Sequence, residues 1–180
     1  NFALSKGLGR HLDGARVFNA SVKLGVDVKE ISQCFDSMSI CLSKGLAAPV
    51  GSLLVGSNEL VSKARRWRKM VGGGMRQAGI LAAAGIYALE HNIKRLADDH
   101  RHASELAKAL GELSSFKLQS MPVTNMVLLD LEPKRYQSLQ QYLSDNGVKT
   151  SSQRWVMHRD VSSANIDQLI ALCRNFDQRV

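Results

Sequence analysis

The residue best able to do covalent chemistry is Lys44, where an apolar stretch ends in Ser-Lys-Gly. Residues 36–42 predict a strand, and the turn that follows is rich in small residues. A lysine that stands among small neighbours and behind a buried strand would lose hydration, which favours its neutral amine. A neutral amine can form a Schiff base with a carbonyl compound. An ordinary lysine in a glycine-rich turn is the other interpretation of this stretch alone.

A carboxylate and a guanidinium occur upstream, in the segment His11-Leu12-Asp13-Gly14-Ala15-Arg16. If a strand ends here, Asp13 projects from its carboxyl edge, with Arg16 one turn away. Asp13 and Lys44 are 44 − 13 = 31 positions apart, about the length of one strand-helix-strand unit. They would then end neighbouring strands, at the edge where open α/β sheets bind ligands. A Schiff-base lysine paired with a carboxylate for a pyridinium nitrogen is what pyridoxal phosphate requires.

Four segments carry a family resemblance. They are HLDGAR at 11–16, CLSKGLAAPVGS at 41–52, RKMVGGGMRQAG at 68–79, and Thr124-Asn125-Met126. Together they resemble the low-specificity threonine aldolases, which belong to the aspartate-aminotransferase-like superfamily of pyridoxal-phosphate enzymes, fold type I. The resemblance implies an α/β fold. Residues 1–112 would form the C-terminal part of the large cofactor-binding domain with a long connecting helix, and residues 113–180 a small C-terminal α+β domain.

The same resemblance implies roles for individual residues. Lys44 would form the internal aldimine with the cofactor, and Asp13 would keep its pyridine nitrogen protonated. Arg16 and Arg154 would hold the carboxylate of a β-hydroxy-α-amino acid, which is cleaved by a retro-aldol reaction. Threonine or allo-threonine would give glycine and acetaldehyde, as in threonine catabolism and glycine biosynthesis.

Arg76 is a further candidate for cofactor binding. It stands at the start of a helix predicted over 77–91, and a cation there is unfavourable unless an anion offsets it. We therefore expect a phosphate or a substrate carboxylate nearby. The preceding Gly72-Gly73-Gly74 is costly in backbone entropy unless a close approach is needed, so this loop is expected against another backbone or the cofactor.

Two functional interpretations stand together. Members of the family place a phosphate-binding turn and a ring-stacking side chain before the aspartate motif, and the ten residues ahead of His11 contain no such turn. We therefore expect the C-terminal part of a threonine aldolase. One interpretation is a lyase whose site is completed by a further segment. The other is a catalytically inactive remnant that at most self-associates. Because the family usually forms tetramers built from dimers, a homo-oligomer is expected.

The composition limits the class of protein and its expected location in the cell. The chain has 180 residues, is 44% hydrophobic, and carries a net charge of +8. No apolar stretch is long enough to span a bilayer, and the N-terminus lacks the apolar core of a signal peptide, so a cytoplasmic location is expected. The three cysteines, Cys34, Cys41 and Cys173, indicate reduced and buried thiols. The spacing of the histidines does not predict a metal site.

The positive charge is concentrated in Lys63–Lys69. As a helix, this segment puts Leu60, Ala64 and Trp67 on one face and spreads its cations over the rest. A solvated face near an anionic cofactor or a subunit interface is favoured over a nucleic-acid surface, because only 6% of the chain is aromatic. Ser57 or Asn58 is the expected helix cap. Residues 51–56 predict a buried strand, 92–110 a helix and 148–151 an edge strand.

Overall fold

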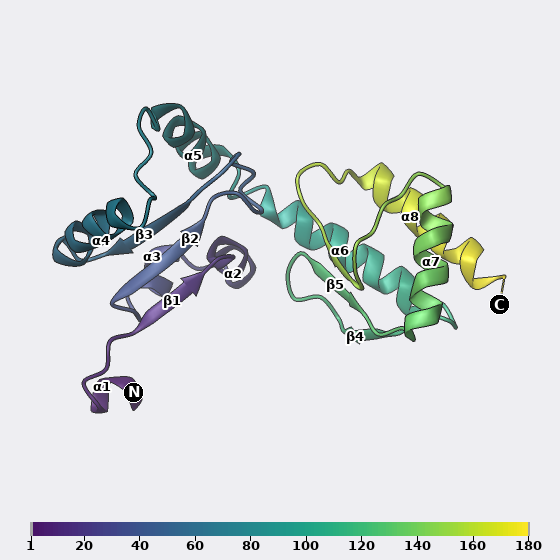
Figure 1. The fold of residues 1–180 in the computed structure, drawn as a ribbon. Helices are drawn as coiled ribbons and strands as arrows, with labels where there is room; N and C mark the ends of the chain where they lie inside the picture. The colour runs from purple at the N-terminus through teal and green to yellow at the C-terminus, as the bar shows by residue number, and fades with distance from the viewer. Residues whose placement is uncertain (1, 180) are drawn as a thin grey trace. The chain divides into compact units, whose positions relative to one another are not determined.

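The computed structural model describes residues 2–179, which form two compact units divided after Lys94 (Figure 1). The boundary expected from the sequence, after residue 112, left helix α6 (Leu96–Gly111) with the first part. In the structure α6 contacts the sheet and the last helix of the second unit. It belongs there because its buried face supplies Leu106, Ala107 and Leu110 to the second unit's core.

The first unit is built on a three-stranded sheet in the order β1-β2-β3. The strands are β1 (His11–Gly14), β2 (Ser37–Cys41) and β3 (Ser52–Gly56). β1 and β2 are parallel, with Asp13 opposite Ser39, and β3 runs antiparallel to β2. A parallel pair needs a crossover, which α2 (Val17–Leu24) and α3 (Val28–Ser32) provide. The strand-helix-strand unit predicted from the Asp13–Lys44 spacing is therefore present.

An ion pair joins the residues that enter the two parallel strands. Asp36 accepts hydrogen bonds from the Arg10 backbone N–H at 2.7 Å and from Arg10 Nη2 at 2.9 Å. In return, the Arg10 carbonyl accepts the backbone N–H groups of Asp36 and Ser37. The hydrogen bonds from Arg10 hold the pKa of Asp36 below its usual value. Side chain and backbone thus fix the register from which β1 and β2 start.

The prediction of a buried strand over residues 51–56 is wrong in its burial. β3 lies at the edge of the sheet, and every one of its residues is exposed. Leu53, Leu54 and Val55 are each 41–42% exposed. Successive side chains of a strand point to opposite faces, so β3 is partly exposed on both faces within the part of the chain described here, although α4 contacts the strand. An apolar run predicts a strand, but the cover for that strand has to come from other segments.

Helix α4 (Asn58–Met70) carries the basic segment. Its cap is Ser57, one of the two predicted candidates, with Oγ accepting the Leu60 N–H at 3.2 Å. The chain then turns back on the helix through Gly72, whose φ is +88°. The Gly73 N–H donates to the Arg68 carbonyl at 2.8 Å, and a Cβ on Gly73 would lie 3.2 Å from that oxygen. The loop therefore closes on the last turn of the helix that precedes it, and the expected approach to another segment or to the cofactor stays a prediction.

Helix α5 (Gly79–His91) begins two residues later than predicted. Arg76 therefore precedes the helix and lies in the connection between α4 and α5. Gln77, which follows it, has a φ of +49°, in the left-handed region that breaks a regular helix. The macrodipole of the helix is thus weaker support for an anion at Arg76 than the sequence indicated.

The second unit packs helices on a second three-stranded sheet, ordered β4-β5-β6 and antiparallel throughout. Besides α6 its elements are β4 (Leu118–Ser120), β5 (Met126–Leu129), α7 (Pro133–Asp145), β6 (Arg154–Val156) and α8 (Ser163–Asp177). The strand predicted over 148–151 is absent, because this stretch is held to α7 instead. The Val148 N–H donates to the Leu143 carbonyl, and Tyr136 Oη lies 3.1 Å from Thr150 Oγ1.

The cysteines agree only in part with the expectation of buried thiols. All three are free, and Cys173 is fully buried, which raises the pKa of its thiol to about 12. Cys34 is exposed, because it lies in the turn after α3 and not within a strand. None of the helices within residues 2–179 is both long and apolar enough to cross a membrane.

The Asp177 carboxylate contributes to the stability of the second unit in a pH-dependent way. Its carboxylate accepts the Ser115 N–H at 2.8 Å and the Ser115 hydroxyl, which lowers its pKa from the ordinary 3.8. The stabilisation is complete above pH 3.8 and is lost as the pH falls through the lowered pKa. Asp177→Asn should remove this part of the acid destabilisation, measured by urea unfolding at several acidic pH values. Asp167→Asn, on the exposed side of the same helix, is the control and should behave like wild type.

Candidate functional site

Two predicted site residues lie at one edge of the first sheet. Asp13 is the last residue but one of β1, and Lys44 lies three residues beyond Cys41, where β2 ends. Because β1 and β2 are parallel neighbours, their carboxyl ends meet at the same edge. Both side chains belong to exposed residues. A carboxylate and an amine are therefore both exposed at the carboxyl edge of a parallel strand pair.

The turn after β1 is shaped by Asp13 and Gly14. Asp13 Oδ1 accepts the Ala15 N–H at 3.1 Å, which fixes the carboxylate against the turn. Gly14 is buried opposite Ile40, and a Cβ added to it would lie 2.6 Å from the Ser39 carbonyl oxygen. Only glycine lets the two strands approach this closely. The Asp-Gly pair thus combines an exposed acid with a position where no side chain fits.

Lys44 stands on a loop that main-chain hydrogen bonds hold closed. The Leu42 N–H donates to the Gly51 carbonyl, and the Ala48 N–H donates to the Leu42 carbonyl, both at 3.0 Å. The Ala47 N–H reaches the Lys44 carbonyl at 2.8 Å. Leu42, Leu46 and Ala48 are buried beneath the loop. The lysine is carried on a rigid base formed by apolar side chains that point inward.

The prediction that Lys44 loses hydration is not met within this chain. Its neighbours are small, as expected, but small neighbours leave the side chain exposed. Desolvation requires atoms that cover the amine, and the strand behind it covers only the base of the loop. Any desolvation of Lys44 must therefore come from a bound molecule or from other protein segments.

The three predicted arginines occupy different places. Arg16 is half-buried at the N-cap of α2, two residues beyond β1, and so shares the edge with Asp13 and Lys44. Arg76 is exposed in the connection between α4 and α5. Arg154 opens β6 in the second unit, where it lines a groove of about 600 Å³ with Lys149 and His158. The structure thus groups Asp13, Arg16 and Lys44, while Arg76 and Arg154 stand on separate segments.

One polar residue near the lysine loop was not predicted to have a role. Asn92 follows α5 and is buried, and its Nδ2 donates to the Leu46 carbonyl at 2.7 Å. The sequence placed Asn92 at the start of a helix over 92–110, whereas the next helix starts at Leu96. An asparagine at a helix end is a recognised signal for a cap, but its reach to a loop 46 positions away is not visible in the sequence.

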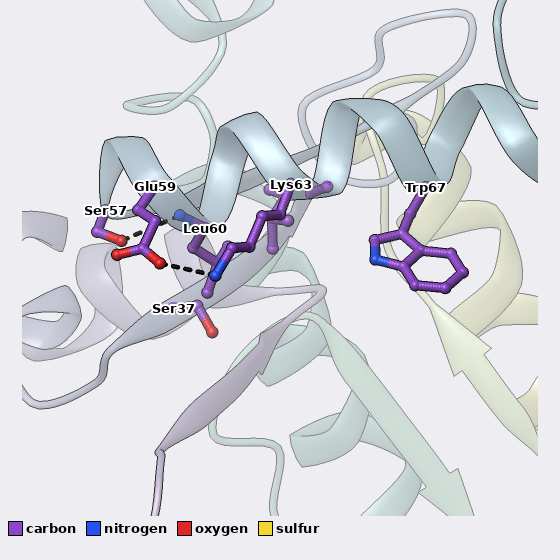
Figure 2. A pocket seen from close by; sticks show the side chains of 8 residues that line it. Ser37, Ser57, Glu59, Leu60, Lys63 and Trp67 are labelled. Carbon is purple, nitrogen blue, oxygen red and sulfur yellow. Dashed lines mark hydrogen bonds and ion pairs between the residues drawn. The ribbon is translucent and has the colours of Figure 1, made fainter.

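Figure 2 shows a second groove, which lies between α4 and the strands β2 and β3. Its volume is about 570 Å³, and it is lined by Ser37, Leu54, Ser57, Glu59, Leu60, Lys63, Ala64 and Trp67. Lys63 and Glu59 pair at 2.7 Å and are both largely exposed. Such a pair is too well solvated to activate either group. Within residues 2–179 there is no cluster of three metal-ligating side chains.

Solved structures identify the fold. A structure from Exiguobacterium, named as an aromatic amino acid beta-eliminating lyase/threonine aldolase, superposes with a TM-score of 0.83 at 22% identity, covering 97% of this chain and 54% of that one. Threonine aldolase of Leishmania major gives a TM-score of 0.76 at 18% identity, covering 97% and 54%. A structure of SPT with PLP gives 0.70 at 15% identity, covering 98% and 49%. The chain has the fold of pyridoxal-phosphate enzymes of fold type I, as predicted.

Sequence comparisons define the family more narrowly. The family model described as Beta-eliminating lyase matches residues 1–133, and the chain belongs to that family. It is 45% identical to low specificity L-threonine aldolase of Escherichia coli K12, over 97% of this chain and 53% of that protein. It is 40% identical to low-specificity L-threonine aldolase 1 of Arabidopsis thaliana, over 89% and 47%. The chain spans about half the length of these curated relatives.

Gly14 provides a test of the edge geometry. Gly14→Ala should destabilise the first unit by about 1–3 kcal/mol, because the new methyl group overlaps the Ser39 carbonyl and forces the strands apart. Gly9→Ala is the control, since a Cβ there has no heavy atom within 4 Å. The measurement is amide hydrogen exchange at increasing urea concentrations, read from peptides of the first unit. Equal stability of the two variants would show that the strands tolerate a side chain at this edge.

Proposed function

We propose that this chain supplies the lysine and the aspartate of a pyridoxal-phosphate site in a lyase. The enzyme would cleave threonine or allo-threonine to glycine and acetaldehyde. The observation that carries the proposal is the position of Asp13 and Lys44, both exposed at the carboxyl edge of adjacent parallel strands. The names of the curated relatives, which are threonine aldolases, support the choice of substrate.

The residues present fit the cofactor. Lys44 is exposed, so its Nζ is accessible to the cofactor's aldehyde. Asp13 presents a carboxylate to the same edge, with Oδ1 held by the Ala15 N–H. A carboxylate held in this way can keep a pyridine nitrogen protonated by pairing with its charge. When bound, pyridoxal phosphate accepts the electrons released as the substrate's Cα–Cβ bond breaks.

The other residues would bind and orient the charged groups. Arg16, at the same edge as Asp13, would hold the substrate carboxylate, since a planar guanidinium offers two parallel donors to it. Arg154 of the second unit is proposed for the same role on the family resemblance alone. Arg76 would contact an anion, such as the phosphate. The cofactor ring would also remove water from Lys44, whose own neighbours leave it exposed.

Covalent trapping tests the role of Lys44. The chain is incubated with pyridoxal phosphate, reduced with borohydride, digested and mapped by mass spectrometry. We expect the main adduct on Lys44. In Lys44→Ala this adduct should be lost, while the other lysines of the variant show the same low level of adduct as in wild type. Lys63→Ala is the matched control, because Lys63 is exposed and paired with Glu59. An adduct spread evenly over surface lysines, and unchanged in Lys44→Ala, would rule out the proposed site.

We also propose that the chain acts as a homo-oligomer. Among its exposed large hydrophobic residues, all but Met121 and Val123 belong to the first unit. They include Leu54, Trp67 and Ile80, which is 83% exposed. This surface also favours the second candidate function, a non-catalytic chain that only self-associates. Adduct formation at Lys44 distinguishes the two candidates.

Sedimentation velocity tests the association. We expect the sedimentation coefficient to rise with concentration, because apolar side chains of the first unit are buried between copies. Leu54→Glu should weaken this rise, since it places a charge among the exposed apolar side chains beside α4. Val123→Glu, at a residue 68% exposed in the second unit, is the matched control. A monomer at every concentration, in wild type and variants alike, would exclude both self-association and the non-catalytic candidate.

A further inference from the structure

Helix α5 packs against the lysine loop along one narrow stripe. Its buried residues are Gly85 and Ala88, and the buried Asn92 follows the helix. The spacing 85, 88, 92 puts all three on one helical face, whereas Ile86 and Tyr87 on other faces are more than half exposed. A Cβ on Gly85 would lie 3.0 Å from Leu42 Cδ1, so the stripe lies against the start of the loop that carries Lys44.

The stripe ends at Asn92, whose side chain forms a buried hydrogen bond. Asn92 is 5% exposed, and its Nδ2 donates to the Leu46 carbonyl at 2.7 Å. Leu46 lies two positions beyond Lys44 and is itself 3% exposed. A buried carbonyl that loses its donor cannot turn to water without moving the backbone. The Asn92 amide therefore holds the loop from outside, in addition to the bonds that close the loop on itself.

We infer that Asn92 is a positioning residue, which fixes the Lys44 loop through the Leu46 carbonyl and so keeps the lysine at the same edge as Asp13. The inference rests on the proposed function, since it gives Asn92 a purpose in cofactor attachment. Lys44 is exposed and has a flexible side chain, so its location depends on the backbone beneath it. Asn92 does not contact the reacting atoms in this role.

Asn125 offers a matched control within the same chain. It too is a buried asparagine, 2% exposed, whose Nδ2 donates to a backbone carbonyl, that of Met157, at 2.8 Å. Asn125 and Met157 both belong to the second unit. Asn125→Ala thus removes a bond of the same kind without touching the lysine loop. A general loss of stability would follow from either variant, but a specific effect on Lys44 should follow only from Asn92→Ala.

The first measurement is amide hydrogen exchange of the cofactor-free chain, read from a peptide covering residues 42–51. In Asn92→Ala this peptide should exchange about tenfold faster, which corresponds to the loss of one buried hydrogen bond. Asn125→Ala should leave it unchanged. Asn92→Leu keeps the branched shape in a larger side chain but lacks the donor, and it is used if Asn92→Ala unfolds the unit. Unchanged exchange in a folded Asn92 variant would overturn the inference.

The second measurement is the share of borohydride-fixed pyridoxal phosphate on Lys44 relative to Lys63, together with the visible circular dichroism of the bound cofactor. We expect the Lys44 share to fall about tenfold and the dichroic signal to be lost in Asn92→Ala, with both retained in Asn125→Ala. Faster exchange with an unchanged Lys44 share would reduce Asn92 to a structural role and overturn the inference. If wild type forms no Lys44 adduct, the proposed function fails. Hydrogen exchange alone then decides whether Asn92 fixes the Lys44 loop.

Discussion

The parallel pairing of β1 with β2 is the constraint on which the rest of the first unit depends. It brings the carboxyl ends of two strands to one edge, so that Asp13 and Lys44 can be 31 positions apart and still lie at the same edge of the sheet. The pairing is fixed at its start by the Arg10–Asp36 ion pair and at its end by Gly14, where no side chain fits. An exposed ion pair contributes little energy alone. Here it works together with the backbone bonds between the same two residues.

Much of this arrangement could be predicted from the sequence because its signals are local. The Asp-Gly turn, the cap at Ser57 and the triple glycine each require particular residue types at fixed spacings. The parallel crossover was predicted from the sequence spacing between Asp13 and Lys44. Family resemblance supplied the fold, and the structural and sequence comparisons confirm it. The roles of Lys44, Asp13 and the three arginines stay proposals, since they depend on a cofactor.

The errors share a physical cause, which is that burial depends on distant segments. The apolar run at Leu53 to Val55 predicted a buried strand, yet its cover is absent from the described part of the chain. Lys44 was expected to lose hydration, but small neighbours expose a side chain as readily as they crowd its base. The hydrogen bond of Asn92 could not be predicted because its partner, Leu46, lies in another part of the sequence. Local patterns specify which element forms, and tertiary contacts decide what it touches.

The division of the chain after Lys94 also affects how its thermal behaviour should be understood. The large apolar cluster belongs wholly to the second unit, while the open sheet edge and the lysine loop belong to the first. Two units with such different cores need not melt together, so a single midpoint would not describe the molecule. If the first unit unfolds at a lower temperature, the second unit still gives a strong helical signal. Retained ellipticity is therefore a poor guide to the integrity of the site, and sample quality has to be judged from the first unit itself.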